Sequence, residues 1–191
     1  MSIVTAVRSS QSITIAADTL AVFGEGMIVP TQNARTSKLM PIGNAIVGGT
    51  GWAVYDDIID HYLIDHAAPD LTSRRDIYTF FLELWSALRE KYTLVNEQAA
   101  SKDTPFGDLD ASFLVASPGG LFKVSSDLGV TEFAQWYAIG SGAEYAMGAM
   151  HAMADQGVDA ERVARAGCQA AIDLDAHCGG EIDVMRVELQ A

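Results

Sequence analysis

The sequence has little of what marks a secreted, membrane-spanning or nucleic-acid-binding protein. Its two cysteines, Cys168 and Cys178, are too few for a disulfide framework, so we expect a reducing compartment. Its 12 basic residues are outnumbered by 25 acidic ones, and the net charge of -13 repels a phosphate backbone. No run approaches the roughly 18 continuous apolar residues of a membrane span, and no leader-like segment opens the chain. We therefore expect a cytoplasmic protein that binds neither nucleic acid nor membrane.

Apolar residues, by contrast, make up 49% of the chain. A chain of 191 residues can bury roughly 70% of the surface of its unfolded state, which allows a sizeable hydrophobic core. No internal repeat or low-complexity tract divides the sequence. We therefore expect a single domain over residues 1–191.

The predicted strands and helices fall into groups and do not alternate. Residues 19–37 have an irregular pattern, and the polar segment 96–110 is predicted to be a mobile surface loop. The hydrophobic pattern predicts strands at 3–7, 13–17, 38–40 and 44–47, helices at 52–66 and 73–92, strands at 112–116, 121–124 and 136–139, helices at 141–154 and 159–177, and a strand at 182–189. This grouping favours packed sheets flanked by helices over βαβ units. Ser73, with Asp76 three residues later, and Asp159 are predicted to cap the starts of the helices at 73–92 and 159–177.

The first predicted hairpin begins at the very start of the sequence, which draws attention to Ser2. Chain ends are usually loose unless they are tied into a sheet. A serine is a weak nucleophile until a base takes its proton, and an α-amine, with an ordinary pKa of about 7.7 to 8, suits that task near neutral pH. If Met1 is removed, Ser2 carries its own base. Ser2 is therefore a candidate nucleophile, although a small residue after an initiator Met is also commonplace.

Asp18 and Lys38 form a second candidate pair. Asp18 ends a predicted strand of small apolar residues, and a carboxylate buried at a sheet end needs a partner. A cation such as Lys38 beside the amine of Ser2 would favour the neutral amine. Gly48, in a Gly-Gly turn, allows close approach of another backbone and could offer an N–H group to an oxyanion. A strand-end ion pair and a tight turn are the alternative interpretations.

Ser141, Asp175, His177 and Cys178 are candidates nearer the end of the chain. The residues around Ser141 lack the spacing of a nucleophile elbow. Ser141 is therefore predicted to cap a helix, and its hydroxyl could also hydrogen-bond a catalytic amine. Asp175, His177 and Cys178 suggest a cysteine hydrolase, but on the helix predicted over 159–177 such neighbours would point apart.

Asp57, His61 and Asp65 share one predicted helix face with a spacing of four residues. Such a face could bind a metal ion, but the sequence offers no further ligands, so we interpret it as a solvated face. We expect neither a metal nor a cofactor.

Taken together, these positions resemble the proteasome β-subunit family of N-terminal-nucleophile hydrolases, particularly bacterial members such as HslV and the proteobacterial proteasome homologues. The resemblance extends over nearly the whole chain. Ser2 stands at the family's N-terminal threonine, and Asp18 matches its active-site aspartate in an Ala-Ala-Asp-Thr stretch. Lys38 matches the catalytic lysine, and Gly48 the oxyanion glycine.

Two later segments support the resemblance. Residues 140–146 match the family's Gly-Ser-Gly-x-x-Tyr-Ala segment, which assigns Ser141 to its serine. Residues 175–180, Asp-Ala-His-Cys-Gly-Gly, resemble its Asp-Ala-Tyr-Ser-Gly-Gly. The differences are a serine in place of threonine at position 2, which lacks the methyl group that restricts the rotamer, and Cys178 in place of a serine. Leu20 replaces a common arginine, and the segment from Asp18 to Lys38 is longer than in most relatives.

The resemblance implies an α+β fold, a four-layer αββα sandwich, and a peptidase in which Ser2 attacks the peptide carbonyl. Asp18 and Lys38 would tune its amine, Gly48 would bind the oxyanion, and Ser141, Asp175 and Cys178 would position the N-terminus. It also implies a homo-oligomeric ring, hexameric or heptameric and double, that takes peptides or unfolded proteins, with an ATPase unfoldase as a candidate partner. Two alternatives stay open, a catalytically silent ring-forming homologue and a small-molecule amidase.

Overall fold

The computed structural model describes residues 2–23, 26–28, 32–34, 36–92, 109–154 and 156–190. It contains eleven strands and four helices within these residues. In chain order they are β1 (Ile3–Arg8), β2 (Ser12–Asp18), β3 (Ala21–Phe23), β4 (Gly26–Ile28), β5 (Leu39–Ile42), β6 (Ala45–Thr50), α1 (Val54–Ile64), α2 (Arg74–Glu90), β7 (Ser112–Ser117), β8 (Gly120–Val124), β9 (Val130–Phe133), β10 (Trp136–Gly140), α3 (Ala143–Ala154), α4 (Ala160–Leu174) and β11 (Ile182–Glu188).

The strands form two large antiparallel sheets and one short hairpin. The first sheet has the order β10-β1-β2-β11, the second has the order β5-β6-β7-β8-β9, and β3 pairs with β4. In the first sheet Ile3 lies opposite Gly140, and Val4 opposite Ala17. The first residues of the chain are therefore held between two neighbouring strands.

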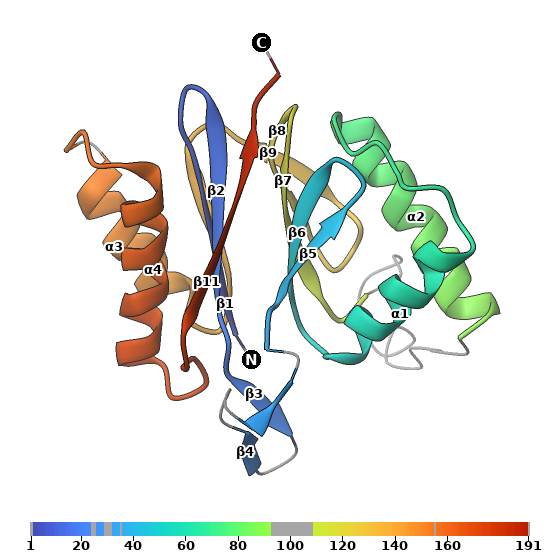
Figure 1. The fold of residues 1–191 in the computed structure, drawn as a ribbon, viewed down its shortest axis with the longest axis horizontal. Coiled ribbons are helices and arrows are strands. Elements are labelled where there is room, and N and C mark those ends of the chain that lie inside the picture. Colours follow the sequence, from blue (N-terminus) through green and yellow to red (C-terminus); the bar gives the residue numbers. More distant parts are fainter. Residues whose placement is uncertain are drawn as a thin grey trace.

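The two sheets pack face to face, with a helix pair on each outer face (Figure 1). Helices α3 and α4 cover the first sheet through an apolar cluster that includes Ile3, Ala164 and Cys168. Helices α1 and α2 cover the second sheet through a larger cluster that includes Phe81 and Phe113. A third cluster lies between the sheets. This arrangement is the expected four-layer αββα sandwich.

The two central strands of the first sheet are buried on both faces, which explains their composition. All seven residues of β2 and the first five residues of β1 are buried. Strands of this kind show continuous apolar runs, because neither face meets water. The buried hydroxyl of Thr5 is satisfied by donation to the carbonyl oxygen of Ala164, at 3.0 Å.

Two helix starts confirm their predicted caps. Ser73 and Asp76 form a complete capping box at the start of α2, and Asp159 accepts hydrogen bonds from two backbone N–H groups at the start of α4. Ser141, in contrast, is not the cap of α3, because this helix begins at Ala143. Within the described residues, no helix combines the length and apolarity needed to cross a membrane.

Three other sequence predictions need correction. The segment 19–37, predicted to be irregular, contains the β3–β4 hairpin. Strand β9 was not predicted, because its exposed residues Thr131 and Glu132 break the apolar pattern. Helix α4 ends at Leu174 and does not continue to residue 177, since Asp175 adopts an extended conformation. Most of the predicted mobile loop, residues 96–108, lies outside the described residues.

Candidate active site

Asp18 is the centre of a hydrogen-bond network at the end of β2. Its side chain is fully buried, and one carboxylate oxygen accepts the backbone N–H of Ile3 at 3.0 Å and the ammonium of Lys38 at 2.5 Å. Its other oxygen accepts the N–H of Gly179 at 3.0 Å. Three segments that are distant in the sequence therefore meet at one carboxylate, which satisfies the requirement that a buried charge be paired and hydrogen-bonded.

Ser2 lies directly before β1 and is buried. The strand pairing brings Gly140 opposite Ile3, and Gly140 has a φ of +111°. A Cβ atom at position 140 would lie 2.0 Å from the carbonyl oxygen of Ser2. Only glycine fits this backbone. The absence of a side chain at Gly140 therefore lets the start of the chain lie close to the segment that carries Ser141.

A cleft of about 410 Å³ opens beside Ser2 and Lys38. Its walls come from the segment before β5, from the end of β6 and the start of α1, and from two residues of the β7 region. The lining residues are Ser2, Leu20, Ala21, Asn33, Thr36, Ser37, Lys38, Gly49, Thr50, Gly51, Trp52, Ala53, Val54, Tyr55, Asp56, Asp57, Ala111 and Phe113. The exposed Trp52 is held at the rim, because its indole N–H donates to Asp110 at 2.8 Å. A cleft of this size is in the range of binding sites for small molecules and short peptide segments.

Gly48 is not among the residues that line this cleft. A Cβ atom at position 48 would lie 2.6 Å from Val4 Cγ1 and 3.3 Å from Ile15 Cδ1, so Gly48 allows the two sheets to pack closely. Gly49 and Gly51 do line the cleft, and the N–H of Gly49 makes a long hydrogen bond of 3.4 Å to the carbonyl oxygen of Lys38.

Ser141, Asp175 and Cys178 lie together on the other side of the network. The Ser141 hydroxyl, first of all, and the backbone N–H of His177 lower the pKa of Asp175 to about 2. The thiol of Cys178 donates to Asp175 at 3.5 Å and lies 3.9 Å from the Ser141 oxygen. Burial raises the pKa of Cys178 to about 11, so this thiol is a hydrogen-bond donor and a poor nucleophile.

The prediction that Asp175, His177 and Cys178 would point apart is wrong. It assumed a helix up to residue 177, whereas α4 ends at Leu174 and a turn follows. In this turn the imidazole Nδ1 of His177 lies 3.1 Å from Asp175. Sequence analysis also missed Gly140 and Gly179. The Gly-Ser-Gly and Gly-Gly motifs are evident in the sequence, but a long-range contact to Ser2 or Asp18 leaves no local signal in it.

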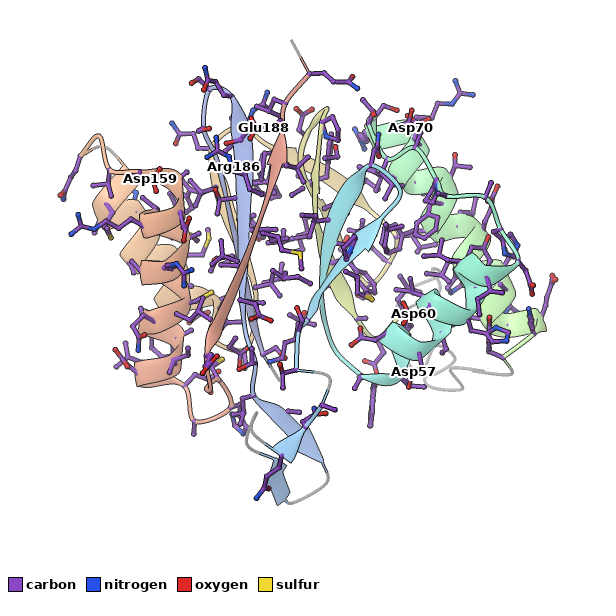
Figure 2. The ribbon with its side chains drawn as sticks, viewed as in Figure 1. Asp57, Asp60, Asp70, Asp159, Arg186 and Glu188 are labelled. Atoms are coloured by element: carbon purple, nitrogen blue, oxygen red, sulfur yellow. The ribbon has the colours of Figure 1, made fainter. Side chains whose placement is uncertain are left out.

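The three residues considered as metal ligands do not share one site. Asp65 pairs with Lys91 at 3.0 Å, and His61 Nδ1 contacts the Tyr92 hydroxyl at 2.7 Å. Asp57 projects from α1 (Figure 2) and lines the cleft. The part of the chain that the structure describes contains no group of three His, Cys, Asp or Glu side chains that could hold a metal ion.

The chain is similar to proteins whose structures have been solved. No protein-family model matches the sequence, and no curated protein matches it. The structure of Thiobacillus denitrificans BPH, a bacterial proteasome homologue, in complex with epoxomicin matches with a TM-score of 0.90 and 34% identity, over 99% of this chain and 100% of that chain. BPH from the same organism in a second structure also gives 0.90 and 34%, with 98% of each chain covered.

A more distant structure has the same fold. HslV from Trypanosoma brucei matches with a TM-score of 0.68 and 22% identity, over 97% of this chain and 99% of that chain. Together with the identity to BPH over the full length, these matches confirm the resemblance found in the sequence. The chain belongs to the proteasome β-subunit-like family of N-terminal-nucleophile hydrolases.

Proposed function

We propose that this protein is a peptidase whose nucleophile is the hydroxyl of Ser2 once Met1 has been cleaved off. The observation that carries the proposal is the buried Asp18 network beside a cleft that Ser2 and Lys38 both line. A chain whose first strand is fixed by a buried carboxylate holds its N-terminus in one place, as a nucleophile requires.

The reaction begins with transfer of the Ser2 hydroxyl proton to the free α-amine of the same residue. The hydroxyl oxygen then attacks the peptide carbonyl, the amine passes the proton to the leaving amine, and an ester on Ser2 is left. Water, deprotonated by the same amine, hydrolyses this ester and restores the enzyme. The ammonium of Lys38, held by Asp18, disfavours a second positive charge on the α-amine and so keeps the amine neutral and able to accept the proton.

The oxyanion requires backbone donors that face the cleft. Gly49 and Gly51 line the cleft with Ser2, whereas Gly48 packs between the sheets. Gly48 remains the proposed oxyanion donor at this turn, and Gly51, which lines the cleft beside Ser2, is a second proposed donor. Ser141, Asp175 and Cys178 position the start of the chain from the side of β10 and the turn after α4.

The assembly proposed with this function is a homo-oligomeric double ring of six or seven subunits per ring, with the clefts facing an inner chamber. Peptides or unfolded proteins are the proposed substrates, and an ATPase unfoldase is the proposed partner. Membership of the family and the match to HslV support this assembly. Native mass spectrometry of the purified protein tests it directly through the number of subunits.

The decisive experiment compares wild type with Ser2→Ala and Ser2→Thr. The mass of the N-terminal peptide is measured first, and hydrolysis of a set of fluorogenic peptides is measured next. We expect Met1 to be absent, Ser2→Thr to stay active and Ser2→Ala to be inactive. Epoxomicin, the ligand of the T. denitrificans structure, provides a second probe, which should bind wild type and not Ser2→Ala. Equal hydrolysis by wild type and Ser2→Ala would refute the mechanism, and an assembled ring that retains Met1 would favour the silent homologue.

A further inference from the structure

The turn that follows α4 contains a histidine that the proposed mechanism does not use. Its Nδ1 atom lies 3.1 Å from Asp175 Oδ1, and its backbone N–H donates to the same oxygen at 3.0 Å. Asp175 is itself held by α4, since its N–H donates to the carbonyl oxygen of Ala171 at 2.8 Å. The His177 side chain is 48% exposed, whereas that of Asp175 is only 11% exposed. The imidazole therefore covers the carboxylate on its solvent side.

The direction of this hydrogen bond follows from the chemistry of the two groups. The hydrogen bonds to Asp175 keep its pKa at about 2, so it is a carboxylate at neutral pH and can only accept. His177 must then carry its proton on Nδ1. With Oδ1 engaged by His177, the second oxygen, Oδ2, receives the thiol of Cys178 at 3.5 Å.

Two routes lead from this turn to the nucleophile. The first passes through Ser141, which donates to Asp175 and directly follows Gly140, the residue packed against the carbonyl group of Ser2. The second passes along the turn to Gly179, whose N–H donates to Asp18 at 3.0 Å. The carbonyl oxygen of Gly179 also accepts the N–H groups of Thr19 and Leu20, at 3.2 and 2.9 Å. The conformation of one short turn thus affects both carboxylates of the site.

We propose that His177 is a positioning residue that acts through Asp175, by fixing the carboxylate and the turn that together hold the start of the chain. It does not line the cleft and has no direct contact with substrate in this role. The inference rests on the proposed function, because the positioned group is the proposed nucleophile.

Three variants distinguish the effect of the hydrogen bond to Asp175 from the effect of the imidazole side chain itself. His177→Asn places an amide N–H close to the position of Nδ1 and can still donate to Asp175, whereas His177→Gln places its amide farther from the backbone. His177→Leu has no donor. We expect kcat to fall about tenfold in His177→Leu and His177→Gln, because each loses a hydrogen bond to a charged carboxylate. His177→Asn should retain kcat within about twofold, and KM should change little in all three.

The assay uses the assembled protein, with Ser2→Ala and wild type measured alongside. Equal loss in His177→Asn and His177→Leu, a change confined to KM, or unchanged kcat in all three variants would overturn the role of His177. Equal activity of Ser2→Ala and wild type would instead refute the proposed function. Hydrogen exchange of the peptide that contains Gly179, followed by mass spectrometry, tests the positioning without activity. Exchange should be faster in His177→Leu than in wild type and His177→Asn, and identical exchange in all three would overturn the inference.

Discussion

Asp18 and Asp175 are held in different ways, although both lie beside the start of the chain. Asp18 is fully buried and is fixed by two backbone N–H groups and the ammonium of Lys38. Asp175 lies nearer the surface and is held mainly by side chains, those of Ser141, His177 and Cys178, with one backbone N–H. One carboxylate is thus built into the sheet, and the other depends on the residues of a turn.

The comparison shows which contacts the fold itself provides. The backbone donors to Asp18 belong to Ile3 in β1 and to Gly179. Their hydrogen bonds form when the strands pair and the turn closes. Asp175 stands at the C-terminal end of α4, where the helix dipole disfavours a negative charge. Its pKa is nevertheless lowered, so its hydrogen bonds outweigh the dipole. Changes near Asp175 should therefore be tolerated better than changes near Asp18.

The largest effect is expected for Asp18→Asn. The amide group puts an N–H donor against another donor, Ile3 N–H or Gly179 N–H, and removes the charge that Lys38 needs. We expect the free energy of unfolding to fall by about 3 to 5 kcal/mol, as for other broken buried ion pairs, and peptidase activity to be lost. Urea denaturation and peptide hydrolysis measure the two effects. A variant as stable as wild type would contradict the central role given to Asp18.

Lys38→Met should have the next largest effect on stability. The methionine fills a similar volume, and Asp18 retains its two backbone donors, so one charged partner is lost from a buried carboxylate. We expect the free energy of unfolding to fall by about 2 to 3 kcal/mol. The same urea experiment gives this value. A loss larger than that of Asp18→Asn would mean that the ammonium, and not the carboxylate, organises the site.

Asp175→Asn should have a smaller effect, together with a change in acid stability. Its carboxylate has a pKa lowered from 3.8 to about 2, so it stabilises the folded state above about pH 4, and this contribution is lost as the pH falls through 2. We expect the stability of wild type to decline more steeply than that of Asp175→Asn between pH 4 and pH 2. Activity at neutral pH should fall about tenfold, the equivalent of one charge-assisted hydrogen bond. Parallel acid profiles in the two proteins would contradict the assigned hydrogen bonds.

The smallest effect is expected at the opposite end of α4. Asp159 caps the start of this helix (Figure 2), remote from Asp175 at its other end, and accepts the N–H groups of Glu161 and Arg162. Asp159→Ala should reduce stability by about 1 kcal/mol, the usual effect of losing a cap, and leave kcat unchanged. Thermal unfolding and the peptide assay provide the check. A fall in kcat would show that helix stability alone disturbs the site, which would weaken the specific roles given to both carboxylates.

Much of the fold could be predicted from local patterns. The capping box at Ser73 and Asp76 and the cap at Asp159 were predicted because capping depends on residues within one helical turn. The apolar runs of β1 and β2 predicted buried strands, and the segregation of strands and helices predicted the layers. Ser2, Asp18 and Lys38 were selected by their chemistry and by the resemblance to the family.

Other features were decided only by tertiary packing. Asp175 and His177 meet because α4 ends at Leu174, and the sequence pattern carried no sign of that end. The resemblance predicts an oxyanion role for Gly48, but it does not predict the close contacts of Gly48 with Val4 and Ile15, which depend on how closely the two sheets approach. Local sequence determines which groups are present and which elements they belong to. Contacts between segments more than 100 residues apart, such as Gly179 with Asp18, form only when the layers pack.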